Sequence, residues 1–248
     1  KLAGVNSINW GRVLAQVVYY FTSAVNLGAP DRKVSFTVPT GNFGDIFAGY
    51  IAKRMGLPID QLIVATNQND ILHRCLSGQG YHKDTVHPSI SPSMDIQVSS
   101  NFERALFDAY DRDGNAVAQL MQELGEGGFD VSQGAAQVLS GHYTSGRASE
   151  EETTQTIAAT LARSAELLCP HSAVAVKVAN DMRDPATPKI TLATAHPAKF
   201  PDAVEAATDI RPPLPPRMAD LYDRPERVTR VANDLDALKT QIKGLIAK

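Results

Sequence analysis

Apolar residues recur at helical spacing near the start of the chain. From Ile8 onward this spacing places them along one predicted helix, which Gly28 ends. The apolar positions are Trp10, Val13, Leu14, Val17, Val18, Phe21 and Val25. Asn6 and Ser7, directly before this stretch, are the candidate caps. The pattern therefore predicts a buried helix.

A strand, a glycine loop, a helix and a second strand follow. Residues 33–38 alternate between apolar and polar side chains, which is typical of a strand, and they run into the loop at 39–45. Residues 46–55 then predict a helix, and 61–65 a short apolar strand. Two parallel strands joined by a crossover helix indicate an α/β fold. The loop after the first strand then lies at the carboxyl edge of the sheet, where ligands of such folds bind.

Residues 66–100 show little periodicity and are rich in Asn, Ser, His and Pro. They predict either a long functional loop or a small irregular subdomain. Four polar residues directly follow the second strand, at the same edge as the glycine loop, so we expect them near the ligand; turn formation is the alternative. These are Thr66, Asn67, Asn69 and Asp70.

Mostly helical patterns fill the middle of the chain. Helices are predicted at 102–110, 117–124 and 150–168, and Ser149 with Glu152 forms a capping box for the last of them.

The α/β pattern resumes in the last third of the chain. Residues 173–182 predict an apolar helix and 189–193 a strand. Residues 211–217 are expected to be extended, because consecutive prolines exclude a helix, and 235–246 predict a terminal amphipathic helix.

Composition narrows the classes of partner. The formal net charge is −3 and the pI is near 6.1, so the chain lacks the basic excess that nucleic acid or an anionic membrane attracts. No apolar run approaches the roughly 20 residues that span a bilayer. Cys75 and Cys169 stand far apart without a second thiol at metal-ligand spacing, which favours a reduced, cytoplasmic location.

The segment between the first strand and its helix carries the clearest chemistry. Its residues are Thr40, Gly41, Asn42, Phe43, Gly44 and Asp45. Successive backbone N–H groups at such a junction can surround a phosphate dianion, and glycine lets the backbone approach closely. The segment matches neither nucleotide-binding motif and no lysine follows, so one compact phosphate monoester fits better. Gly-Asn and Gly-Asp pairs also form ordinary turns, so these residues alone leave a plain turn open.

Five separated segments, in order, closely resemble those of threonine synthases. They are residues 6–9, 38–45, 65–70, 91–95 and 194–200. The resemblance spans nearly the whole chain and points to the longer branch of that family, found in many bacteria and fungi. It implies a fold-type II pyridoxal phosphate enzyme, similar to the tryptophan synthase β subunit, that converts O-phosphohomoserine and water to threonine and phosphate.

The resemblance also implies a fold and a division into parts. The fold class is α/β, with a parallel sheet, flanking helices and a mostly helical insertion. Residues 1–70 correspond to the part that holds the cofactor phosphate, 71–168 to a loop-rich and then helical insertion, and 169–248 to a C-terminal α/β part with terminal helices. The lysine that holds the cofactor covalently belongs to the family's N-terminal part and has no counterpart here. The chain is thus expected to be a C-terminal portion, inactive by itself, with that N-terminal part as its partner.

Residue roles follow from the same resemblance. The loop residues Gly41, Asn42, Phe43, Gly44 and Asp45 match the cofactor-phosphate site, with Asp45 interpreted as a cap that shapes the loop. Thr194 matches the hydroxyl that meets the pyridine nitrogen and does not hold it protonated; capping of the next helix is the alternative. Four residues at the first helix start are candidates for the substrate's phosphate or carboxylate, with simple capping as the alternative. They are Asn6, Ser7, Asn9 and Arg12.

Other signals predict no further site. His82, Asp84 and His87 match no metal motif, so no metal site is expected. Cys169 is expected to pack and His171 to cap a helix. Two other functions remain open, a threonine dehydratase-like lyase with the same cofactor and a noncatalytic phosphate-binding relative.

Overall fold

A parallel sheet of four strands organises the structure, in the order β5, β2, β1, β6. The strands are β1 (Val34–Pro39), β2 (Ile59–Thr66), β5 (Tyr143–Arg147) and β6 (Lys189–Thr191). Each neighbouring pair is parallel, so the carboxyl ends of the strands meet at one edge. The predicted α/β architecture is therefore observed.

The structure is a computed structural model that describes residue 4 and residues 6–246. One unit ends at Pro212 and contains the sheet, and a second begins at Pro213. The second unit contains two 3-10 helices, Pro216–Met218 and Leu221–Asp223, and α10 (Leu235–Ile246). Across the described residues, no helix combines the length and apolar character that crossing a membrane requires.

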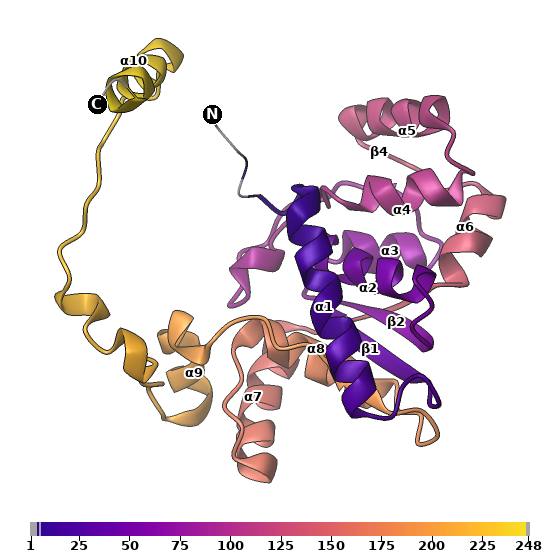
Figure 1. Cartoon of the computed structure of the whole chain (residues 1–248), viewed down its shortest axis with the longest axis horizontal. Helices are drawn as coiled ribbons and strands as arrows, with labels where there is room; N and C mark the ends of the chain where they lie inside the picture. The colour runs from indigo at the N-terminus through magenta and orange to yellow at the C-terminus, as the bar shows by residue number, and fades with distance from the viewer. Residues whose placement is uncertain (1–3, 5, 247–248) are drawn as a thin grey trace. The chain divides into compact units, whose positions relative to one another are not determined.

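Both faces of the sheet are covered, as buried parallel strands require. Successive residues of β2 point to opposite faces, so Leu62 and Val64 join one core and Ile63 and Ala65 join another. The first core contains residues of α1 (Trp10–Asn26) and α2 (Gly44–Arg54), which pack together beside the sheet (Figure 1). The second core contains α8 (Pro170–Asp181). Together these cores fix the ends of β1 and β2.

The middle of the chain is mostly helical, as predicted. It contains α3 (Ile71–Leu76), α4 (Phe102–Ala109), α5 (Gly114–Glu126) and α6 (Gln133–Ser140). A small antiparallel pair, β3 (Tyr81–His82) and β4 (Gly128–Phe129), lies among them. Local sequence patterns did not predict α3, α6, β3, β4 or β5. Strand β5 is short and polar, and only Tyr143 of it is fully buried, so the alternation that marks a strand is absent.

Most predicted helix boundaries hold within a few residues. The capping box of α7 (Glu150–Ser164) is present, because Ser149 accepts from the Glu152 N–H and Glu152 accepts from the Ser149 N–H. That helix ends four residues before the predicted 168, at Ser164. The N-cap of α1 is Asn9, rather than Asn6 or Ser7.

Short elements complete the first unit. They are the 3-10 helices η1 (Pro92–Met94) and η2 (Pro197–Lys199) and the helix α9 (Pro201–Thr208). Both 3-10 helices lie in segments that the sequence analysis singled out, at 91–95 and 194–200.

Candidate phosphate-binding site

The glycine loop joins β1 to α2 at the carboxyl edge of the sheet. Phe43 is the N-cap of α2 and has a left-handed backbone, with φ 62° and ψ −2°. A residue other than glycine pays about 1–3 kcal/mol for this conformation, so the surroundings must enforce it. The Phe43 ring is buried and packs edge-on against Phe102 at 5.1 Å and Tyr143 at 5.2 Å between ring centroids. These rings anchor the loop.

The carbonyl groups of the loop are tied down by the segment before α4. The Ser99 hydroxyl donates to the Gly41 carbonyl at 2.7 Å. Asn101 donates to the Asn42 carbonyl twice, from Nδ2 at 2.9 Å and from its backbone N–H at 3.1 Å. In a trans peptide the N–H points opposite to the C=O. The N–H groups of Asn42 and Phe43 therefore face away from Ser99 and Asn101.

The start of α2 adds further free donors. Its first N–H groups have no intrahelical acceptor, and the Phe43 side chain provides none. Within the part of the chain that the structure describes, no group accepts from the N–H groups of residues 41–45. Consecutive unpaired N–H groups at a helix N-terminus form a site for an anion.

Close packing explains both glycines. A Cβ atom on Gly41 would lie 2.7 Å from the Ser93 carbonyl oxygen, which no real side chain tolerates. A Cβ on Gly44 would lie 3.3 Å from Asn101 Nδ2 and 3.4 Å from the Ser7 carbonyl oxygen. The loop thus fits against the segment of η1 only because Gly41 lacks a side chain, whereas a Cβ at Gly44 would be a tight contact that needs a small shift.

A network of amides positions the segment that presses on Gly41. Asn67 and Asn69 each donate to Asp95 Oδ1, at 2.8 and 2.9 Å. Asn67 also donates to Ser91, at 2.9 Å. Asn67 and Asn69 therefore support the site from behind, through the 91–95 segment. The Asn69 N–H also donates to Asn67 Oδ1 at 2.9 Å, which is the turn-forming role given as the alternative.

Two cavities adjoin the loop, and Thr194 lines both. The smaller, of about 160 Å³, is lined by Pro39, Gly41, Ser93, Met94, His171, Thr194, Ala195, Lys199 and Phe200. The larger, of about 490 Å³, is lined by Arg12, Gln16, Tyr19, Asp45, Leu192, Ala193 and Thr194. The fold thus brings the glycine loop, Thr194 and Arg12 together.

Asp45 has a different role from the predicted cap. It lies in the first turn of α2, and its carboxylate accepts hydrogen bonds from Tyr19 at 2.5 Å and from Tyr20 at 3.1 Å. Burial raises the pKa of Asp45, although both tyrosine hydroxyls act in the opposite direction. The capping interpretation is wrong because α2 begins at Gly44, which places Asp45 inside the helix rather than before it.

Thr194 does not cap the helix that follows it. The N-cap of η2 is His196, whose ring accepts from the Ala198 N–H at 3.2 Å. Thr194 donates its own N–H to the Ser172 hydroxyl at 3.2 Å, and its Oγ1 lies 3.9 Å from the Cys169 sulfur. The capping alternative is therefore wrong, and Thr194 lines both cavities instead.

Relatives of known family match nearly the whole chain. The threonine synthase of Pseudomonas aeruginosa is 54% identical over 244 residues, which are 95% of this chain and 51% of the relative. The chain belongs to the threonine synthase family. A family model described as the C-terminal part of threonine synthase matches residues 172–242. The chain spans about half the length of the curated threonine synthases it matches.

Solved threonine synthases share the fold. A threonine synthase from Brucella melitensis, solved with bound pyridoxal phosphate, matches with a TM-score of 0.94 and 55% identity, over 98% of this chain and 53% of that one. The yeast threonine synthase matches with a TM-score of 0.88 and 40% identity, over 98% and 53%. These matches confirm the predicted fold-type II architecture.

The four candidate substrate residues have unequal surroundings. Arg12 lines the larger cavity. Asn9 caps α1 by accepting from the Gly11 N–H at 2.9 Å, and Asn6 accepts from the Ile8 N–H at 3.1 Å. Ser7 offers its carbonyl to Asn101 at 3.2 Å. The capping alternative thus describes Asn9, while Arg12 is the member that reaches a cavity.

Sequence reasoning missed Ser99 and Asn101, which hold the loop. The polar run at residues 99–101 is visible in the sequence before the predicted helix, but such a run is typical of helix capping. Asn101 makes no cap hydrogen bond in α4, and its amide is directed to the loop instead.

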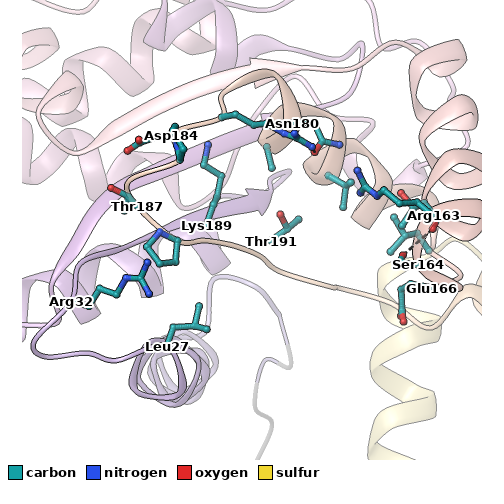
Figure 2. Close-up of a pocket in the computed structure, with 17 residues that line it drawn as sticks. Leu27, Arg32, Arg163, Ser164, Glu166, Asn180, Asp184, Thr187, Lys189 and Thr191 are labelled. Carbon is teal, nitrogen blue, oxygen red and sulfur yellow. Dashed lines mark hydrogen bonds between the residues drawn. The ribbon is translucent and has the colours of Figure 1, made fainter.

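A cavity of about 700 Å³ lies beside the edge strand β6 and is lined also by residues of α7 and α8. Figure 2 shows Arg32, Thr187 and Lys189 around it, all near the amino ends of β1 and β6. Ligands of open α/β sheets bind at the carboxyl ends instead, so we place the functional site at the glycine loop.

Proposed function

We propose that this chain is the C-terminal portion of a pyridoxal phosphate-dependent threonine synthase, which converts O-phosphohomoserine and water to threonine and phosphate. The observation that carries the proposal is the glycine loop. Its carbonyl groups are tied by Ser99 and Asn101, so its N–H groups are turned outward. Family membership supports the reaction, since the matched relatives bear that name.

The cofactor phosphate would bind at Gly41, Asn42, Phe43, Gly44 and Asp45. The donor set fits a dianion, because it consists of backbone N–H groups at a helix N-terminus. The space beside Gly41, which a Cβ atom would fill, supports the same assignment. Pyridoxal phosphate, when bound, supplies an electron sink for the carbanions of the reaction.

The remaining roles belong to side chains that orient ligands. Thr194 would meet the pyridine nitrogen from the cavity wall that it shares with Gly41. Arg12 would bind the substrate's phosphate or carboxylate, for which a guanidinium offers paired donors. Asn6, Ser7 and Asn9 would complete that subsite at the start of α1. The chain holds and orients both ligands.

The covalent step requires an amine that we assign to the upstream part of the enzyme, so this chain supplies no catalytic residue. The chain by itself is expected to release no phosphate from O-phosphohomoserine, whereas the intact parent does. A cytoplasmic location is part of the proposal, supported by the free cysteines Cys75 and Cys169. The division into parts at residues 70 and 168 stays a prediction.

The exposed face of α1 supports the upstream part as the partner. Buried residues on one face of this helix reach the core. The other face carries an apolar stripe, defined by Trp10, Leu14, Val18 and Val25, of which each side chain is at least half exposed. Because relatives are about twice as long as this chain, we propose that the upstream part covers this stripe.

A glycine pair tests the phosphate loop. Gly41→Ala is expected to weaken binding of pyridoxal phosphate about tenfold or more, because its Cβ would force the loop away from Ser93 at a cost of about 1–3 kcal/mol. Gly134→Ala is the control, since a Cβ there meets no atom within 4 Å. Equilibrium dialysis measures both. Equal affinities for the two variants would refute the assignment of the loop.

A further inference from the structure

A carboxylate stands directly behind the glycine loop. Asp45 follows Gly44, lies in the first turn of α2 and lines the larger cavity together with Arg12. A carboxylate in the first turn of a helix is attracted by the free N–H groups there, because they form the positive end of the helix dipole. If the Asp45 side chain turned toward these groups, it would occupy the donors that the loop offers to an anion.

The Asp45 carboxylate is directed to α1 instead. Tyr19 donates to Asp45 Oδ1 at 2.5 Å, and the Tyr20 hydroxyl lies 3.1 Å from the same oxygen. The Tyr20 hydroxyl also donates to the Asp45 backbone carbonyl at 2.9 Å. Among the residues that the structure describes, no backbone N–H donates to the Asp45 carboxylate. Both tyrosines therefore hold Asp45 on the side of α2 that faces α1.

Close packing fixes the two tyrosines. Tyr20 is fully buried, and its ring packs against Phe36 of β1 at 4.7 Å between centroids and stacks on Tyr19 at 5.2 Å. A Cβ atom on Gly49 of α2 would lie 2.6 Å from Tyr20 Cε1, so the ring fits against this helix because position 49 is glycine. Helices α1 and α2 pack together along these contacts (Figure 1). The core thus fixes the rings that present their hydroxyl groups to Asp45.

The glycine loop is consequently held from two sides. Ser99 and Asn101 bind its carbonyl groups, which turns its N–H groups outward. Tyr19 and Tyr20 bind the acidic side chain of the first turn of α2, which would otherwise compete for those N–H groups. The backbone N–H and the carboxylate of Asp45 then serve opposite purposes, since the first is open to an anion and the second is withheld from it.

We propose that Tyr19 and Tyr20 are positioning residues, which hold the Asp45 carboxylate against α1 and so keep it away from the N–H groups of the glycine loop. The consequence for pyridoxal phosphate rests on the proposed function: the cofactor phosphate meets free donors and no competing carboxylate. Both hydroxyl groups act through Asp45. Without them, a bound anion and a carboxylate would compete for one set of donors and repel each other.

The position of the carboxylate is tested first without any cofactor. Tyr19→Phe combined with Tyr20→Phe removes both hydroxyl groups and retains the rings. NMR of the ¹⁵N-labelled chain is expected to show downfield shifts of the amide protons of residues 44–46 in this double variant, because a carboxylate is a strong acceptor for them. Adding Asp45→Ala is expected to reverse these shifts. Unchanged amide signals in the double variant overturn the proposal.

Tyr50→Phe is the matched control. Tyr50 also lies on α2, and its hydroxyl donates to the carboxylate of Asp108 at 3.1 Å. Its loss is expected to leave the amide signals of the loop unchanged. Tyr19→Phe alone, which keeps the buried Tyr20, is expected to give the shifts of the double variant with smaller size. Shifts as large in Tyr50→Phe as in the double variant overturn the proposal, since any lost tyrosine hydroxyl would then suffice.

The consequence for the cofactor is measured by equilibrium dialysis with pyridoxal phosphate. The double variant is expected to bind about tenfold more weakly than the native chain, a size that the interaction of a carboxylate with a helix N-terminus allows. Adding Asp45→Ala to the double variant is expected to tighten binding again by about fivefold or more. Tyrosines that merely braced α2 would give no such recovery, because Asp45→Ala removes the brace as well. Equal affinities of the double and the triple variant therefore overturn the proposal.

The two measurements separate this inference from the proposed function. If the native chain does not bind pyridoxal phosphate, the assignment of the phosphate loop fails. The amide signals need no cofactor, and they still decide whether the tyrosines hold the carboxylate away from the loop.

Discussion

Replacement of Asn101 tests whether the loop is held from behind. Asn101 is fully buried, and its Nδ2 donates to two carbonyl oxygens, that of Asn42 at 2.9 Å and that of Ser7 at 3.2 Å. Asn101→Asp keeps the shape of the side chain and replaces this donor by an oxygen. The new carboxylate would then face two carbonyl oxygens with no proton to share.

The two replacements of Asn101 differ in size of effect. Asn101→Ala removes two hydrogen bonds, worth about 2 kcal/mol together. The loss is partly offset, since the Asn101 Oδ1 has no partner among the described residues and leaves with the side chain. Asn101→Asp removes the same bonds and adds a buried, unpaired charge, so the expected loss is about 3–5 kcal/mol at neutral pH. The aspartate variant is therefore the less stable of the two.

The penalty of Asn101→Asp also depends on pH. Burial beside two carbonyl groups raises the folded-state pKa of the new carboxyl above its unfolded value of about 3.9. Stability is then greatest below the unfolded pKa and is lost as pH rises through the folded pKa. We expect Asn101→Asp to approach Asn101→Ala in stability as the pH falls toward about 4.

Urea unfolding followed by circular dichroism measures these free energies at several pH values. Asn115→Asp on α5 is the matched control, because Asn115 is exposed, and it is expected to change the stability by less than about 0.5 kcal/mol. The reasoning is refuted if Asn101→Asp is no less stable than Asn101→Ala at neutral pH. If the difference in free energy of unfolding between the two variants does not vary with pH, a buried charge is not the cause of the loss.

Two further predictions concern the surroundings of the site. A hydrogen bond from the Ser149 N–H and, second, one from a lysine side chain lower the pKa of Glu152 below its usual value of 4.5. The stability that these bonds give the folded chain is therefore present above pH 4.5 and is lost as the pH falls through the lowered pKa. Glu152→Gln should therefore cost under about 1 kcal/mol at neutral pH and nothing in acid, measured by thermal unfolding. Leu14→Glu combined with Val18→Glu should weaken binding of the separately produced upstream part about tenfold or more. Val138→Glu on α6 is the control. If it weakens binding as much as the double variant does, the proposal that the upstream part covers the apolar stripe is contradicted.

Local signals were enough to predict the core of the fold. The alternation of apolar and polar residues predicted β1, the glycine loop marked its end, and the helical spacing of apolar residues predicted α2. The βαβ unit could therefore be predicted without information on distant residues. The capping box at Ser149 and Glu152 was predicted for the same reason, since both partners lie within four positions. Resemblance then indicated the fold type and the family, which comparison with relatives confirmed.

Long-range contacts lay beyond those signals. Strand β5 belongs to the sheet because it pairs with β2, about 80 positions earlier in the chain, and its own residues are too polar to reveal this. Asn101 reaches the Asn42 carbonyl across 59 positions. A polar residue before a helix is ordinary, and only the folded chain distinguishes an amide that caps from one that holds a distant loop.

Cys169 is buried as predicted, but Cys169 and not His171 caps α8, and one local rule explains this difference. Proline favours the first position of a helix, so Pro170 makes Cys169 the N-cap and carries His171 into the first turn, where its ring is buried. An N-cap sulfur surrounded by N–H donors is ionised more easily than one that only packs. The same proline therefore fixes the start of α8 and places the Cys169 sulfur 3.9 Å from the Thr194 hydroxyl.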